Sequence, residues 1–118
     1  MEPRGTDWKE VTIDISESTT LSAVCDLGRP FKKLAVLIPT IKSSTVTVTV
    51  SNKSDGTFYP VYTVNPTATG DNAQVTTAAT TAHAVEFDIF GAQFVKILCG
   101  SAQDTSDKVF LVKGIDPV

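Results

Sequence analysis

Residues that could perform nucleophilic, acid–base or metal chemistry are few and scattered in this chain of 118 residues. His83 is the sole histidine, and Cys25 and Cys99 lie far apart in the sequence. A zinc site needs several such ligands that converge, and covalent catalysis needs a base beside its nucleophile. His83 is therefore predicted to be a partly exposed loop residue. We expect no catalytic residue, no metal site and no cofactor.

Carboxylates are the more plentiful candidates, because the chain contains 13 Asp and Glu residues. None of them follows the dense spacing of a calcium-binding loop. Glu86 and Asp88 fall on one face of a predicted strand, a pairing that glycoside hydrolysis would require. A solvated polar face explains the same pair and is favoured. The chain is therefore predicted not to be an enzyme.

Aromatic side chains are the next candidates, because ligand grooves combine rings with a few polar groups. Trp8, Tyr59 and Tyr62 could form such a groove, and Tyr59 follows shortly after an Asp-Gly turn, where side chains tend to be exposed. Packing in the core or against another subunit is favoured over carbohydrate binding for these three residues. Trp8 is expected to pack the N-terminal segment against the domain or against a neighbour.

A row of threonines forms a second candidate surface. Thr45, Thr47 and Thr49 alternate with valines, so they are predicted to share one flat, weakly charged strand face. Exposure to solvent is one explanation. Packing against another copy is the other, because exposed faces and edges of low charge are usually covered in native proteins. These threonines join Trp8, Tyr59 and Tyr62 as interface candidates.

Composition excludes several classes of partner. The net charge of −3 and the scattered Lys and Arg residues argue against nucleic-acid binding, which depends on neutralising phosphates.

No apolar stretch approaches the ~20 residues of a membrane span, and no secretory signal is recognisable. We therefore expect a protein made in the cytosol, with Cys25 and Cys99 as reduced, buried thiols. The length predicts one domain, 1–118, with 1–9 as an N-terminal arm.

The elements that must position these residues are predicted to be strands. Alternating apolar residues, as at Val11 and Ile13, indicate pleated surfaces with one buried face. Asp55-Gly56 between two β-rich runs predicts a hairpin, and Pro60 places the returning strand at an edge or a bulge. The predicted strands are residues 10–15, 21–27, 31–38, 45–50, 57–64, 85–89, 94–99 and 108–113.

The connections are predicted from turn residues. Residues 28–30 are expected to be a turn, and residues 90–92 and 100–107 are expected to connect strands. Residues 65–81 are expected to be a long loop with one short strand near 73–77. Residues 31–38 lack alternation, which predicts a central strand covered on both faces. The fold class is therefore all-β, as a two-sheet antiparallel β-sandwich of jelly-roll type with about eight strands. A closed barrel is the main structural alternative.

Three segments resemble small virion proteins of tailed phages and prophages. They are Phe31–Pro39, the run Val46–Ser51 with Asp55–Tyr62, and Phe87–Ile97, followed by a final strand like Val109–Val112. The resemblance covers about Phe31 to Val112. Many of these relatives carry Trp shortly after the proline, whereas this chain continues with Thr-Ile-Lys.

The resemblance implies a structural protein of the virion. It would be a capsid cement or decoration protein that buries surface between coat subunits, or else a tail or neck accessory protein. Its implied partners are the major capsid protein or other virion subunits, and a homotrimer is favoured. Discoidin-like sugar-binding modules share the Gly-Ala segment that enters the strand Phe94–Leu98, so a carbohydrate-binding jelly roll is the alternative.

Overall fold

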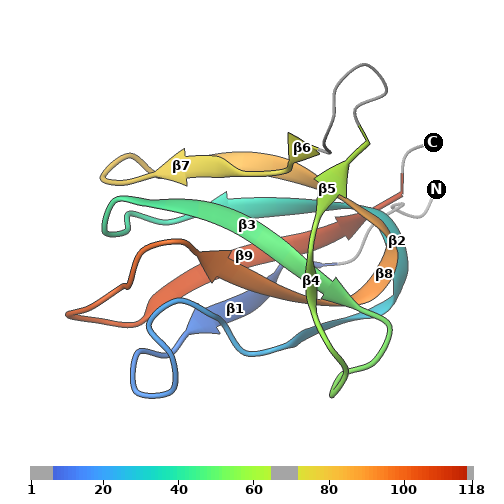
Figure 1. The fold of residues 1–118 in the computed structure, drawn as a ribbon, viewed down its shortest axis with the longest axis horizontal. Coiled ribbons are helices and arrows are strands. Elements are labelled where there is room, and N and C mark those ends of the chain that lie inside the picture. The colour runs from blue at the N-terminus through green and yellow to red at the C-terminus, as the bar shows by residue number, and fades with distance from the viewer. Residues whose placement is uncertain (1–6, 65–71, 117–118) are drawn as a thin grey trace.

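The computed structural model describes residues 7–64 and 72–116, and every regular element in these ranges is a β-strand. Figure 1 shows their arrangement. The all-β prediction is thus confirmed. The strands are β1 (Lys9–Ile13), β2 (Cys25–Ile38), β3 (Ser44–Ser51), β4 (Tyr59–Pro60), β5 (Tyr62–Thr63), β6 (Asn72–Ala73), β7 (Thr76–Ala78), β8 (His83–Cys99) and β9 (Lys108–Ile115).

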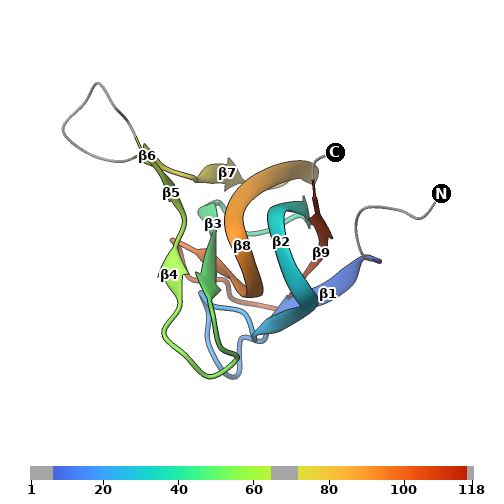
Figure 2. The ribbon, with the colours of Figure 1, turned by 90° about the vertical axis from the view of Figure 1, so that its right-hand side faces the viewer.

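Seven strands form one antiparallel sheet in the order β1-β9-β2-β8-β3-β4, with β7 also paired to β3. Strands β5 and β6 form a separate two-stranded ribbon. The predicted sandwich would have two large sheets, whereas the main strands here belong to a single hydrogen-bonded sheet. Instead, the long strands β2 and β8 curve over together (Figure 2), so that one continuous sheet bends around the core.

The bend in β2 and β8 corrects two predicted connections. Residues 28–30 lie inside β2, and residues 90–92 lie inside β8. The β2–β8 register shifts between Asp26 and Phe31, and Gly28, Phe90 and Gly91 all have positive φ. Bulges and left-handed residues turn a strand sharply without ending it. The predicted strands 21–27 and 31–38 are therefore replaced by the single bent strand β2, and 85–89 and 94–99 by the single bent strand β8.

The predicted hairpin is present. In it, β3 pairs with β4 through Thr49 with Pro60 and Val50 with Tyr59. Strand β4 is the last in the sheet order, which agrees with the edge position expected for Pro60. Part of the predicted loop 65–81 carries the short strands β6 and β7, and 65–71 lie outside the described residues. Of the predicted arm 1–9, residues 1–6 also lie outside them.

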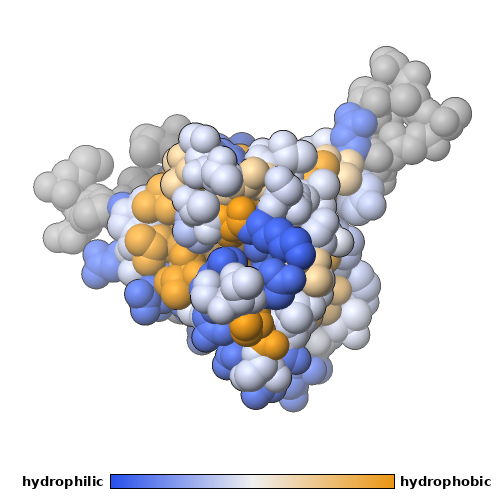
Figure 3. Space-filling view, turned by 90° about the vertical axis from the view of Figure 1, so that its left-hand side faces the viewer, coloured by the Kyte–Doolittle hydropathy of each residue, from blue (hydrophilic) through white to orange (hydrophobic). Residues whose placement is uncertain are grey.

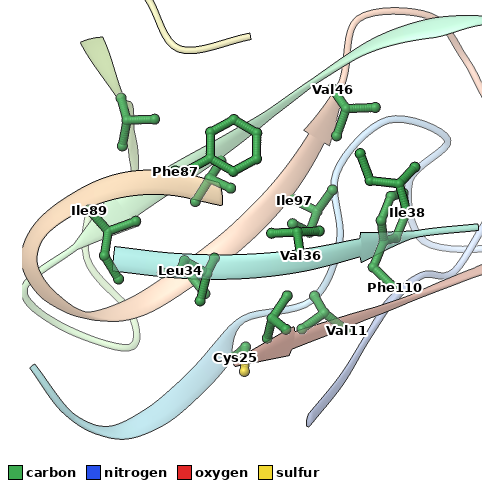
Figure 4. Packing of buried hydrophobic residues seen from close by; sticks show 14 of the residues in the cluster. Val11, Cys25, Leu34, Val36, Ile38, Val46, Phe87, Ile89, Ile97 and Phe110 are labelled. Carbon is green, nitrogen blue, oxygen red and sulfur yellow. The ribbon is translucent and has the colours of Figure 1, made fainter. Parts of the chain in front are cut away.

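The core is built from alternate residues of the long strands (Figure 4), so one sheet buries one face. Strand β2 lies between β9 and β8, as expected for a central strand, but Leu37 is 36% exposed, so its second face is not covered. The largest fully buried apolar side chains are Phe110, Ile13, Leu27, Leu34, Ile38, Ile89, Ile97, Val36, Val46, Val48 and Val61.

A short segment before β2 links the β1 edge to β8. Ser22 N–H donates to Ile97 O (2.9 Å), and Cys99 N–H donates to Thr20 O (2.8 Å). The next residue, Ala23, donates its N–H to the carbonyl of β1 residue 12 (3.3 Å). Strands β1 and β8 are not neighbours in the sheet order, so this segment partly closes the curved sheet in the manner of a barrel.

The side chain of Gln74 joins β8 to the β3 side of the sheet. Its Oε1 accepts from Asp88 N–H (2.7 Å), and its Nε2 donates to Asp88 O (3.0 Å). The backbone of Gln74 donates to Val61 O (3.0 Å) and accepts from Thr47 Oγ1 (2.7 Å). The amide therefore bonds to β8 as the peptide group of a neighbouring strand would.

Candidate functional site

The residues of 7–64 and 72–116 contain no group of three or more His, Cys, Asp or Glu side chains that could hold a metal ion. His83 is half-buried at the start of β8, with Nδ1 3.3 Å from Thr81 O. It borders a hydroxyl-lined hollow of about 550 Å³ with Ser43, Thr45 and Thr77. The other side chains that line this hollow are hydroxyls and alanines, and none of them is a carboxylate or a thiol.

Both cysteines are free and buried, as predicted from the sequence. Burial raises the pKa of the Cys25 thiol, with a smaller opposing effect of the Lys9 charge. Burial also raises the pKa of Cys99, although a hydrogen bond with Ser44 opposes it. A thiol whose pKa is raised stays protonated and is a poor nucleophile. Figure 4 shows Cys25 among the apolar side chains, which indicates a packing role.

The carboxylates of Glu86 and Asp88 are paired with a lysine. Lys33 Nζ lies 2.7 Å from Asp88 Oδ1 and 3.8 Å from Glu86 Oε1. The hydrogen bond with Asp88 is the main cause of a raised pKa of Lys33. The two carboxylates therefore belong to a surface ion-pair network, which agrees with the polar face predicted for them.

The three threonines of β3 do not form one exposed row, so that prediction is wrong. Thr45 is exposed, but Thr49 is only 4% exposed and its Oγ1 donates to Lys96 O (3.4 Å). Thr47 is half-buried and bonds to the backbone of Gln74. Gln74, directly after β6, therefore covers part of this face of β3. Only Thr45 remains available for a contact with a partner.

Trp8 lies on the outer face of the layer formed by β1, β9, β2 and the first half of β8. It is 43% exposed, and Lys113 Nζ lies 5.9 Å from the centroid of its ring. The register places Leu37 beside Leu111 and Thr12 beside Val109 on this face. Val109 is 43% exposed, so the layer presents apolar surface to solvent.

Figure 3 shows hydrophobic residues gathered at the left of the view. Figure 2 views the molecule from the opposite side and places β9 and β1 at its right, so the two figures show the same side of the molecule. We call this outer face, defined by Trp8, Leu37, Val109 and Leu111, the apolar sheet face. Glu10 pairs with Leu111 on the same face, and Lys113 lies beside Trp8, so charged side chains flank the apolar residues. Exposed apolar residues that gather on one face with polar residues around them are typical of sites that contact other macromolecules.

A groove of about 570 Å³ lies where β2 and β8 bend, on the side of β3 and β4. Tyr59 and Phe90 are 64% and 61% exposed at this groove. We call it the corner groove. It is lined by Pro30, Val50, Ser51, Asn52, Tyr59, Ile89, Phe90, Gly91, Ala92 and Gln93.

Phe90 was not among the residues predicted for a site. Its φ of 59° is left-handed, a conformation that costs roughly 1–2 kcal/mol for a residue with a side chain. A strained residue that also exposes its ring points to a functional constraint. The pair Phe90-Gly91 is the signal in the sequence, but the same two residues also fit an ordinary connection between strands.

The corner groove is braced by hydrogen bonds from β2. Asp26 Oδ1 accepts from Gln93 Nε2 (2.9 Å) and from Gly28 N–H (2.8 Å). On the other side of the bulge, the Arg29 guanidinium lies 3.9 Å from the centroid of the Phe31 ring and bonds to Asp116 Oδ2 (2.7 Å). These contacts connect the bend of β2 to β8 through Gln93 and to the residue that follows β9 through Asp116.

The bracing predicts a titration that can be measured. The hydrogen bond from Gln93, and then that from Gly28, lower the pKa of Asp26 below its ordinary value. A lowered folded-state pKa stabilises the fold above the unfolded value of about 3.9, and this contribution is lost as pH falls through the folded value. NMR titration of the Asp26 carboxyl should show the lowered pKa, and Gln93→Leu should raise it. Titration of Asp26 at its ordinary value in the unmodified protein would contradict this.

The structure separates the three aromatic candidates. Tyr59 lines the corner groove, whereas Trp8 lies on the apolar sheet face. Tyr62 is 48% exposed on β5, where it pairs with Ala73, and does not line the groove. Of the three aromatic candidates, Tyr59 lines the corner groove, where Phe90 is a second exposed ring.

The structure is similar to the crystal structure of the SPBc2 prophage-derived protein YomS, with a TM-score of 0.51 and 16% sequence identity. The match covers 94% of this chain and 96% of that chain. At this identity the likeness shows a common fold. No protein-family model matches the chain, and no curated protein sequence matches it.

No helix in residues 7–64 or 72–116 is long and apolar enough to cross a membrane.

Proposed function

We propose that this chain is a structural protein of a phage particle, of the capsid cement or decoration type. The likeness in fold to a prophage-derived protein supports a phage origin, as does the resemblance of Phe31–Val112 to small virion proteins. In this proposal the folded-over sheet acts as a jelly-roll-like sandwich, with its inner face as the core and the outer face of β1, β9 and β2 available for contacts. The proposal assigns no enzymatic reaction to the chain.

The apolar sheet face is the observation that carries this proposal. Trp8, Leu37 and Val109 are each more than a third exposed there, although Leu37 and Val109 belong to the well-paired strands β2 and β9 and Trp8 directly precedes β1. Burying apolar surface yields about 25 cal/mol per Å² removed from water. A rigid sheet face of this kind is suited to packing against coat subunits of an assembled shell.

The mechanism follows from which state of the shell the protein binds. If it binds the assembled shell and not the free coat protein, binding shifts the equilibrium towards the shell by mass action. The proposed partners are the major capsid protein and two further copies of this chain, as a homotrimer at three-fold positions. The proposed location is the virion, after synthesis in the host cytoplasm.

The test is to find the protein in particles. Virions released from the host that encodes the chain would be purified on a density gradient, separated into heads and tails, and analysed by quantitative mass spectrometry. We expect the chain in the head fraction at a fixed ratio to the coat protein. Its presence in tails alone would support the tail or neck accessory alternative, and its absence from particles would refute a virion role.

The apolar sheet face can be tested directly by substitution. The double variant Leu37→Lys, Val109→Lys places two charged side chains on the apolar sheet face, and both must lose water when the protein docks. We therefore expect its affinity for shells that lack the protein to fall at least about tenfold. Co-sedimentation measures the loss. The matched control is Val75→Lys, because Val75 is 51% exposed and lies outside this face. If the unmodified protein, the double variant and the control bind shells equally well, the apolar sheet face is not part of the interface.

A further inference from the structure

We propose that the corner groove is a binding site for a neutral saccharide, in which the rings of Tyr59 and Phe90 contact the sugar. This inference goes beyond the proposed virion role and does not depend on it. It rests on the position of two exposed aromatic rings, on the uncharged lining of the groove and on the strained conformation of Phe90.

The two rings supply the apolar part of the site. Tyr59 and Phe90 belong to β4 and β8, and both line the groove while remaining 64% and 61% exposed. Exposed rings on two separate strands leave a large apolar area without an internal partner. The C–H faces of a pyranose ring match such surfaces, while its hydroxyl groups stay hydrogen-bonded to water or to neighbouring polar groups.

The polar part of the lining carries no charged side chain. Ser51, Asn52 and Gln93 are its hydroxyl and amide groups. Gln93 is held in place by its 2.9 Å hydrogen bond to Asp26, and Ser51 accepts from Lys53 N–H (3.2 Å). Amides and hydroxyls can both donate and accept, which is the pattern that sugar hydroxyls require. A charged ligand would find no opposite charge on these lining residues.

The backbone at the groove is preorganised. Phe90 has φ of 59° and Gly91 has φ of 85°, within a strand whose ends are paired to β2 and β3. The paired strands therefore fix the backbone that carries the ring, which reduces the backbone entropy lost on binding. Glycine would adopt the same backbone conformation at lower cost. The presence of phenylalanine is explained by contact of its ring with a ligand.

The volume and chemistry favour a small ligand over a second copy of the chain. Ligand sites have volumes of roughly 300–1,000 Å³, and the groove at about 570 Å³ falls within this range. An apolar protein surface laid over Ser51, Asn52 and Gln93 would desolvate them without giving hydrogen bonds, which is costly. Sugar hydroxyls would satisfy them.

The test uses the full chain, biotinylated and bound to tetrameric streptavidin, as a probe for an array of neutral and acidic glycans. Several copies of the chain on one tetramer make weak binding at each single site detectable. We expect binding to a subset of neutral glycans. The disaccharides cellobiose, maltose, lactose and chitobiose, with sialyllactose as the acidic comparison, would then be titrated into isotope-labelled protein. Amide shifts should map to the corner groove. No binding, or binding of acidic glycans alone, overturns the proposal.

Two variants separate binding from folding. Tyr59→Ala should reduce saccharide affinity by at least about tenfold, which corresponds to about 1.4 kcal/mol. Phe90→Gly should cause a similar loss while its melting temperature is unchanged or raised, because glycine relieves the left-handed strain. Tyr62→Ala is the matched control and should bind normally. The proposal is overturned if both groove variants still bind saccharide. It is also overturned if light scattering shows a dimer of the unmodified protein that both groove variants dissociate, because the groove would then be an interface between two copies of the chain.

Discussion

Replacing Phe110 by alanine is expected to lower the free energy of unfolding by about 3–5 kcal/mol. Phe110 is fully buried in the middle of β9, opposite Val11 of β1, and Figure 4 shows it within the apolar cluster. Removing the ring loses its transfer free energy and leaves a cavity that paired strands cannot close. This is a large part of the stability of about 5–15 kcal/mol of a typical domain.

The measurement is urea unfolding followed by tryptophan fluorescence, which the single Trp8 makes specific. The matched control is Val109→Ala, on the same strand but on its opposite face, where the residue is 43% exposed. The control should cost about 1 kcal/mol or less. Similar losses for Phe110→Ala and Val109→Ala would show that β9 does not face the core as described.

Replacing Gln103 by leucine is expected to cost about 2–4 kcal/mol, although leucine is more hydrophobic and similar in size. Gln103 is fully buried, and its Oε1 accepts from Lys42 N–H (2.8 Å). Its Nε2 donates to Lys42 O (2.9 Å) and to Ser101 O (3.3 Å). Leucine would leave these backbone groups without the amide that satisfies them.

Gln103 also ties three loops together, because its own N–H donates to Thr19 O (2.7 Å). We therefore expect faster hydrogen exchange at the Lys42 amide in Gln103→Leu, measured beside the unfolding free energy. The control is Lys42→Ala, which keeps the backbone and removes only the exposed ion pair with Asp104, worth about 0–1 kcal/mol. The role assigned to Gln103 is wrong if its replacement costs no more than this control.

Local patterns predicted most of the strands and the hairpin. Val11 and Ile13 alternate with polar residues, and both are buried in β1. The Asp55-Gly56 turn and Pro60 predicted both the pairing of β3 with β4 and its place at the edge. These features were predictable because strand period and turn chemistry act between residues that are close in sequence.

The bend in β2 and β8 could not be predicted in the same way. Residues 28–30 and 90–91 contain turn residues, and the same residues fit both a loop between two strands and a bulge within one strand. The register between Phe31 and Ala92 decides between them, and this pairing joins residues far apart in the chain. The corner groove was missed for this reason, since Phe90 was assigned to a connection.

The threonine row shows the same limit at a surface. Thr47 and Thr49 have the composition of a solvated face, but Thr47 bonds to Gln74, 27 residues further along the chain. Sequence spacing gives the face of a strand on which a side chain lies. It does not give what covers that face, because covering segments come from distant parts of the chain.

By itself, the sequence determined an all-β chain, its main strands, one hairpin and a core of alternating apolar residues, since these depend on the two-residue period of strands and on local turn geometry. It also determined that Cys25 and Cys99 are buried. The tertiary structure alone decided that one sheet folds over through β2 and β8, and that Tyr59 meets Phe90 at a groove. Those features depend on pairing between distant residues, whose register follows from how the whole sheet packs around its core.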